Sequence, residues 1–189
     1  MKLSDFTPTA ETISLHGLGF IQVKLPANRR LHIWHPDLPR RACYEHSAVH
    51  NHRFSFRSTV LVGEQVNCRW NVEIAHPDDN AEHRLISHNG PRSEKGGRLS
   101  REVAHCHLHR AGPFEYYKPG ESYVMDELAY HDTPCDGIVV TLMEKLTEGT
   151  VHASTVIHRD ATFDQDFDRF QLPPEELWGY VALALGADV

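Results

Sequence analysis

The stretch SAVHNHRFSFRSTVLVG, residues 47–63, decides the predicted fold of this chain. His50 and His52 stand two residues apart at the start of a run in which apolar and polar residues alternate. This alternation is typical of a β-strand with one buried face. Because side chains two residues apart lie on the same face of a strand, both imidazoles could bind one metal ion. The stretch therefore predicts a strand that carries two metal ligands.

A third ligand is predicted at His131, in the segment YVMDELAYHDTP at residues 123–134. Support from outside the H-x-H pair matters because the chain has 15 histidines. At that frequency about one H-x-H pair arises by chance. The prediction therefore depends on the Pro-Gly turn and the strand that precede His131 and would bring it to the pair.

The composition indicates one acidic domain over residues 1–189. The chain has 26 acidic residues against 19 Lys and Arg and no long basic run, so we expect no nucleic-acid partner. The N-terminus lacks the apolar stretch of a signal peptide, and no run reaches the roughly 18 apolar residues of a membrane span. We therefore expect a cytoplasmic protein with no membrane partner. The cysteines are too widely spaced for a zinc ribbon or a disulfide framework: Cys43, Cys68, Cys106 and Cys135.

Short strand-like runs separated by glycine and proline predict an all-β domain. The Gly63-Glu64 turn predicts a hairpin between the runs on either side of it. A homodimer joined through open sheet edges is a further expectation. The predicted strands cover residues 12–25 (interrupted at two glycines), 31–34, 53–63, 65–74, 102–110, 114–118, 122–125, 137–143 and 151–158.

The two ends of the chain have different patterns. Residues 1–11 are predicted to be an N-terminal arm. Two prolines and two glutamates open a predicted helix over residues 173–185, which Gly186 ends. Its apolar residues Leu177, Val181 and Leu185 are expected to dock on the sheets.

Two polar segments interrupt this pattern. Residues 75–98 are rich in polar residues and glycine, which predicts a connection without strands. Within it, the segment HNGPRSEKGG at residues 88–97 could act as a lid over a pocket, but a solvated connection is the simpler interpretation. In TFDQDFDRF, residues 162–170, the phenylalanines are spaced for packing and the acids are expected on a solvated face.

Two segments of the chain resemble the two motifs of the cupin superfamily. The first is residues 47–63, and the second is PGESYVMDELAYHDTP followed by IVVTLM, where a turn and a strand deliver the last histidine. Together they span Leu31 to about Met143. The resemblance implies a double-stranded jelly-roll barrel, here with a C-terminal helix.

The cupin pattern has a glutamate where this chain has Phe56 and Arg57. That absence, together with S-x-x-H-x-H and a later Y-x-x-D-x-x-x-x-H, is similar to cysteine dioxygenase and related thiol dioxygenases. The resemblance implies Fe(II) on His50, His52 and His131, although three-histidine sites also take Ni, Zn or Mn. Three neutral imidazoles leave the charge of a divalent metal uncompensated, so a small anionic substrate such as a thiolate is expected.

The chain also departs from that family. The family's tyrosine would fall near Met143, and its carboxylate-binding arginine would lie at residues 17–24, where there is none. Arg57, Arg29 or Arg30 could replace it, although strand parity puts Arg57 on the face opposite the histidines. The predicted pocket lining is Trp34, Phe54, Phe56, Arg57 and Tyr130.

Two alternatives stay open. The segment LHIWHPDLPRR and the VTLM strand are similar to small phage and bacterial cupin-like proteins of unsettled activity, so a non-catalytic ligand-binding or structural role competes with an enzyme. The segment HCHLH is a rival metal site. Its histidines are His105, His107 and His109. On a strand they share one face with neighbours nearly 7 Å apart, so one metal ion could bind two of them but hardly three. The simpler interpretation is an exposed polar face over buried Cys106 and Leu108.

Overall fold

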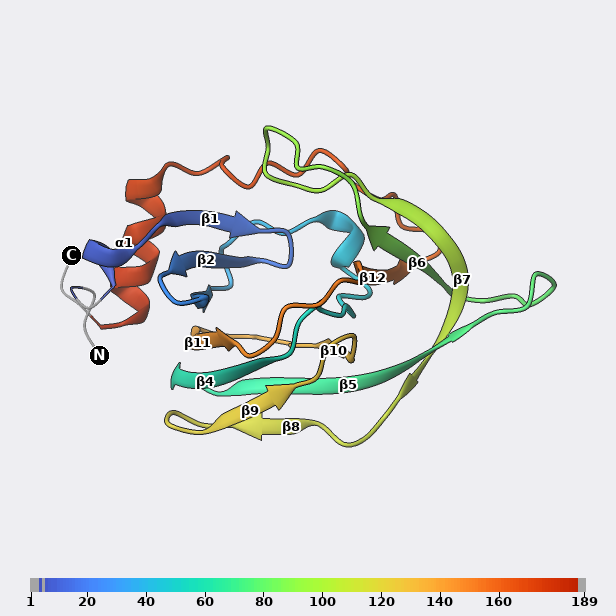
Figure 1. Cartoon of the computed structure of the whole chain (residues 1–189), viewed down its shortest axis with the longest axis horizontal. Coiled ribbons are helices and arrows are strands. Elements are labelled where there is room, and N and C mark those ends of the chain that lie inside the picture. Colours follow the sequence, from blue (N-terminus) through green and yellow to red (C-terminus); the bar gives the residue numbers. More distant parts are fainter. Residues whose placement is uncertain (1–3, 5, 187–189) are drawn as a thin grey trace.

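β-Strands make up most of the computed structural model, which describes residue 4 and residues 6–186. They form two antiparallel sheets of six strands each, followed by one α-helix (Figure 1). The first sheet has the order β1-β2-β3-β11-β4-β9: β1 Thr12–His16, β2 Phe20–Leu25, β3 Arg29–Trp34, β11 Val139–Lys145, β4 Phe56–Val62 and β9 Ser122–Met125. The second has the order β10-β5-β7-β6-β12 with β8 paired to β5: β10 Tyr130–Asp132, β5 Gln65–Ile74, β7 Arg101–Arg110, β6 His83–His88, β12 Ala153–His158 and β8 Glu115–Tyr117.

The all-β prediction with a final helix is confirmed, and the described strands form two sheets and no closed barrel. Short 3-10 helices lie at η2 (Thr7–Thr9) and η3 (Ala42–Tyr44). Residues 1–3 and 5 of the predicted arm lie outside the described residues.

The helix α1 (Pro174–Ala184) begins where two prolines preset the backbone and two glutamates face the positive end of the helix dipole. It ends before Gly186, whose φ of 69° is the left-handed conformation that glycine adopts easily. Leu177 and Val181 are buried against β1 and β3, as the sequence predicts. Nowhere in the described residues is a helix both long and apolar enough to cross a membrane.

The two faces of the first sheet differ in polarity. One face packs against α1 through fully buried aliphatic residues such as Leu15, Ile21 and Ile33. The residues next to them in sequence point the other way and are mixed, with the polar His16, Gln22 and His32 beside the aromatic Phe20 and Trp34. The sheet is thus aliphatic on the helix side and mixed on the other. The mixed face is the one that helps to build the site.

The predicted hairpin at Gly63 is wrong. The strand β4 pairs with β11 on one edge and β9 on the other, so neither edge is free for β5, which belongs to the second sheet. Gly63 therefore marks the point where the chain passes from one sheet to the other. Its φ is 75°, and a side chain there would collide with the carbonyl oxygen of Ile138.

A second correction concerns β6, which lies in the region predicted to be a connection without strands. This strand pairs with β7 on one side and β12 on the other, so it is internal to its sheet. Ile86 is the one deeply buried residue of this strand, and its neighbours are largely polar. Its sequence therefore does not show the alternation of apolar and polar residues that predicts a strand. Two neighbouring strands supply the backbone hydrogen bonds that hold it in place.

Candidate metal centre

Three histidines meet between the two sheets. The ligand nitrogens of His50, His52 and His131 all lie within 4.8 Å of one another. His131 is 3% exposed and His50 is 8% exposed, whereas His52 is partly buried. The Nε2 atoms of His52 and His131 are 3.1 Å apart. Two nitrogens bound to one metal at 2.0–2.1 Å would be about 2.9–3.4 Å apart, so this spacing fits a shared ion.

The backbone fixes two of these histidines to each other. The His50 N–H donates to the His131 carbonyl at 2.9 Å, and the His131 N–H donates back at 2.9 Å. His50 also bridges to Thr155 of β12, so this one residue connects β10 and β12. The expectation that His50 and His52 lie on one continuous strand is therefore wrong, because β4 begins only at Phe56.

Hydrogen bonds at the far nitrogens orient two of the imidazoles. The Nδ1 atom of His50 lies 2.9 Å from the Ala48 carbonyl, which can only accept a hydrogen bond. His131 Nδ1 lies 2.8 Å from the side-chain oxygen of Asn67. In both rings the proton is thus on Nδ1, and the Nε2 lone pair faces the cluster. Burial lowers the pKa of all three histidines, which keeps them neutral as metal binding requires.

Asn67 is a residue of the site that the sequence interpretation missed. Its side chain is fully buried, and its amide group donates to Glu115 at 2.7 Å while its oxygen accepts from His131. Glu115 is held in turn by Arg69 at 2.8 Å. This chain of bonds fixes which way the amide points and therefore which nitrogen of His131 carries the proton. The only signal in the sequence is that polar residues alternate at 65, 67 and 69.

An aromatic wall, formed by Phe54 and Phe56, borders the three histidines. Phe56 is buried, with its ring 4.9 Å from His52 and 6.0 Å from His131 between ring centres. Phe54 also packs beside His52, at 5.4 Å. The metal group that the described residues form contains three histidines and no carboxylate.

The other residues of the predicted pocket, and Met143, do not line the cavity described below. Arg57 is exposed on the outer face of β4, as strand parity indicates, and lines no part of the cavity described below. Trp34 packs with Phe20 in a separate hydrophobic cluster. The Tyr130 hydroxyl bonds to Ser154 at 2.7 Å. Met143 packs against the two phenylalanines of the aromatic wall.

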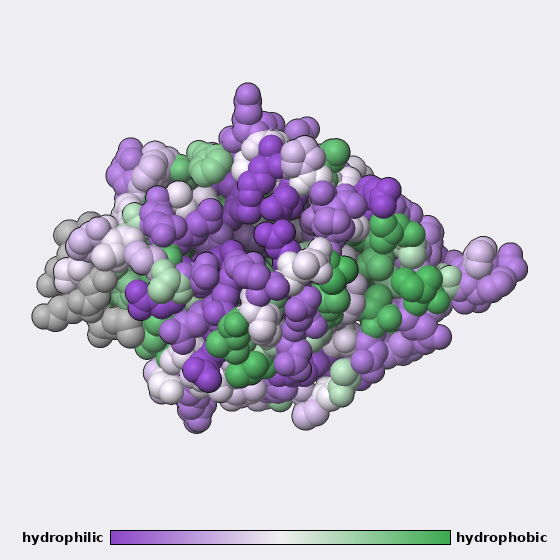
Figure 2. Space-filling model, in the orientation of Figure 1, coloured by the Kyte–Doolittle hydropathy of each residue, from purple (hydrophilic) through white to green (hydrophobic). Residues whose placement is uncertain are grey.

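A cavity of about 200 Å³ opens beside the histidines, and Figure 2 shows hydrophilic residues around a hollow on the face that it draws. His50 and His52 form part of its wall. The rest comes from the β1–β2 turn, η3, β6, β12 and two loops: His16, Gly17, Leu18, Arg41, Tyr44, Asn51, His88, Arg92, Gly96, Gly97, Arg98, Ala153, Ser154, Thr155, Phe167 and Arg169. Four residues of the loop at residues 89–99 thus line the cavity, while residues 91–95 are exposed to solvent, so the loop is a solvated connection that also forms part of the cavity wall.

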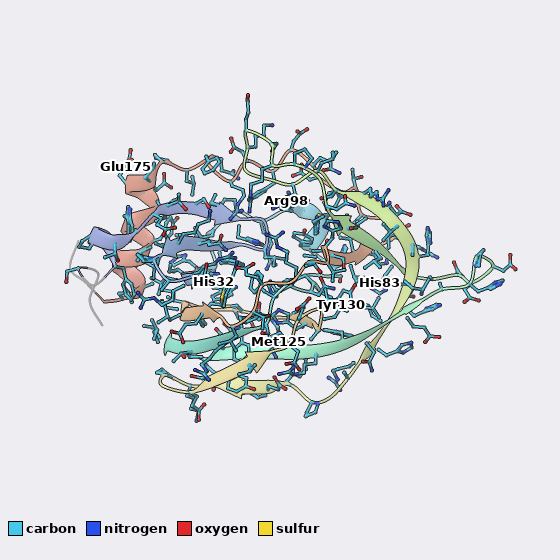
Figure 3. The ribbon with its side chains drawn as sticks, viewed as in Figure 1. His32, His83, Arg98, Met125, Tyr130 and Glu175 are labelled. Carbon is cyan, nitrogen blue, oxygen red and sulfur yellow. The ribbon has the colours of Figure 1, made fainter. Side chains whose placement is uncertain are left out.

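Four arginines and no carboxylate line this cavity. Arg41 comes from the residue before η3, Arg169 from the segment before α1, and the other two from the 89–99 loop. Arg98, labelled in Figure 3, lies where that loop returns toward β7. No sequence motif pointed to these arginines, because the fold brings them together from three separate segments.

The rival histidines face solvent on β7. His105 and His109 are exposed, and each approaches a carboxylate, Glu102 at 3.3 Å and Glu73 at 3.4 Å. Cys106 between them is completely buried. The simpler interpretation of HCHLH as an exposed polar face is therefore confirmed for His105, His109 and Cys106, whereas His107 and Leu108 are partly buried.

The comparisons with known proteins assign no family. No protein-family model matches the chain, and no curated protein matches its sequence. What can be said of function therefore comes from the residues of the site.

Proposed function

We propose that this protein is a metal-dependent enzyme of the cupin type, a non-haem Fe(II) dioxygenase that acts on a small anionic metabolite such as a thiol. The fold in this proposal is a double-stranded jelly roll, with the ligands between its two sheets. The observation that carries the proposal is the convergence of three neutral histidines on the wall of a cavity lined by arginines.

The donor set suits a redox-active metal with open positions. Three imidazoles on one side of an ion leave the opposite side free for substrate and a small molecule such as dioxygen. A bound Fe(II) would supply the electrons for oxygen activation. Ni, Zn or Mn could occupy the same ligands, and the histidines alone do not choose among them.

The surrounding residues have separate tasks in this proposal. Asn67 and the Ala48 carbonyl hold His131 and His50 with their Nε2 atoms toward the ion. Phe54 and Phe56 exclude water from one side of the cluster. The arginines attract an anion and hold it against the open side.

The test combines metal content with oxygen consumption. The purified protein should carry close to one equivalent of a first-row transition metal, and the His131→Ala variant should lose most of it. The Fe(II)-loaded protein should consume oxygen with at least one member of a panel of small thiols and small carboxylic acids. Equal metal content in the two proteins would refute the site.

The second candidate is a cupin-like protein that binds a ligand or serves a structural role without catalysis. The observation that favours it is Met143, which packs in the aromatic cluster at about the position where the resemblance to thiol dioxygenases would place a tyrosine. Metal binding and anion binding without oxygen consumption would support this candidate.

A further inference from the structure

The arginines around the cavity have no anionic partner within the described residues. Ion pairs occupy Arg69, Arg84 and Arg159, but none involves the cavity arginines: Arg41, Arg92, Arg98 and Arg169. Of these four, Arg41 is buried, Arg98 and Arg169 are half-buried and Arg92 is exposed at the rim. A buried charge is normally paired, because an uncompensated one costs several kcal/mol, on the order of 3–5. An unpaired buried cation with three more cations around the same cavity therefore indicates that a ligand supplies the negative charge.

Arg41 shows this most clearly. It is only 8% exposed, and its Nε–H is buried without a hydrogen-bond acceptor. Its guanidinium group stacks on Phe163 and Phe167, which hold its position but supply no anion. A buried donor left without a partner in a native protein calls for a specific explanation. The Arg41 residue that carries this donor lines a cavity large enough for a small ligand.

Arg169 is positioned by neutral groups. Its Nε donates to the Leu15 carbonyl at 2.7 Å, and its Nη2 donates to Ser14 and Gln22 at 3.3 Å. A guanidinium group has five N–H donors, so the two on Nη1 stay available. Burial, with the nearby Arg92, lowers the pKa of Arg169 to about 10, so it is still charged at neutral pH.

The 89–99 loop adds the other two cations in a fixed arrangement. Arg92 donates to the Gly96 carbonyl at 2.6 Å, and Arg98 donates to the Gly90 carbonyl at 3.0 Å. Gly97 brings this loop next to Arg41, since a Cβ there would lie in ordinary van der Waals contact, 3.4 Å from Arg41 Nη2. The carbonyls orient the guanidinium groups without neutralising them, which leaves a preorganised anion site.

We propose that this cavity binds a small metabolite with at least two anionic groups, either a polycarboxylate or a phosphorylated compound. A monoanion would neutralise one guanidinium group and leave the others without an anion, although Arg41 is buried and Arg98 and Arg169 are half-buried. The inference deepens the proposed function. It rests on that function only in placing the ligand beside the metal. The guanidinium groups themselves need no metal to bind an anion.

Calorimetric titration of the full chain, metal-free and metal-loaded, tests this at constant ionic strength. The probes are acetate, tricarballylate and pyrophosphate. We expect tricarballylate or pyrophosphate to bind at least about tenfold more tightly than acetate, since each added charge-assisted hydrogen bond contributes about that factor. The tighter of the two identifies carboxylate or phosphate chemistry. Equal affinity for acetate and both polyanions would overturn the proposal.

A matched pair of arginine variants locates the binding. Arg98→Gln should weaken polyanion binding by about tenfold or more, whereas Arg101→Gln, on the exposed part of β7 just beyond the loop, should leave it unchanged. Circular dichroism checks that both variants fold. Equal affinities in the two variants would overturn the assignment. Polyanion binding in a protein that takes up no metal would refute the proposed function and leave this inference standing.

Discussion

Two groups of three histidines occur in this protein, and they differ in almost everything except residue type. His50, His52 and His131 come from two distant segments and meet in the interior. His105, His107 and His109 follow one another on a single strand and face solvent. The first group has hydrogen-bond acceptors behind its rings, whereas the second has carboxylates in front of them. Clustering in sequence is therefore a poor guide to a metal site, and convergence in space with oriented rings is a better one.

The largest expected effect separates the two groups by metal affinity. His52→Ala should weaken metal binding by more than the roughly 10–100-fold that follows loss of an outer hydrogen-bond partner, because it removes a ligand. His107→Ala should change the affinity less than about twofold. Competition with a chelating dye measures both. Similar losses in the two variants would remove the distinction between the groups.

The next prediction concerns the support behind His131. Asn67→Leu should weaken metal binding about 10–100-fold and destabilise the fold by about 1–3 kcal/mol, because it leaves buried donors and acceptors unpaired. Asn71→Leu, on the exposed part of the same strand, is the matched control and should do neither. Dye competition and urea unfolding give the two numbers. An Asn67→Leu protein with normal metal affinity would show that His131 needs no positioning.

A third prediction concerns how a buried histidine responds to acid. Burial lowers the pKa of His88 to about 4, so the folded state keeps it neutral while the unfolded chain binds a proton below about pH 6.5. Stability from this residue is therefore present above pH 6.5 and is lost as the pH falls toward 4, at up to about 1.4 kcal/mol per pH unit. His88→Gln should flatten the pH dependence of unfolding over this range by that amount. An unchanged slope would contradict it.

The smallest expected effect lies on the exposed face. His105→Gln and His109→Gln each lose an approach to one carboxylate that is open to water, so unfolding free energies should stay within about 0.5 kcal/mol of the parent. Urea unfolding at neutral pH measures this. A loss of more than about 1 kcal/mol would mean that the β7 histidines do more than cover the sheet.

What the sequence predicted and what it missed follow from the range of the interactions involved. Strands such as β2 and β7 and the helix α1 were predictable because alternation, prolines and glycines act locally. The hairpin at Gly63 failed because the choice of partner for β4 depends on β9 and β11, which lie far along the chain. The strand β6 was missed because neighbouring strands rather than its own residues hold it in place.

The site shows the same division. His50, His52 and His131 were identified from motif resemblance, and the structure brings these residues together. Asn67 and the cavity arginines could not be identified, because a single Asn or Arg in a polar stretch carries no mark of its eventual neighbours. Their roles depend on tertiary contacts such as those of Arg169 with Leu15, which are 154 residues apart in sequence.

The reciprocal backbone bonds between His50 and His131 also bear on how the protein folds. The contacts that assemble the centre join residues 79 and 103 positions apart, such as His52 with His131 and Asn51 with Ser154. Loops of that length close slowly, so the centre should be among the last parts to form. An ion that binds only the assembled centre would act on the native state alone and slow its unfolding. In cells depleted of the metal, the native protein would then unfold faster in addition to lacking its bound ion.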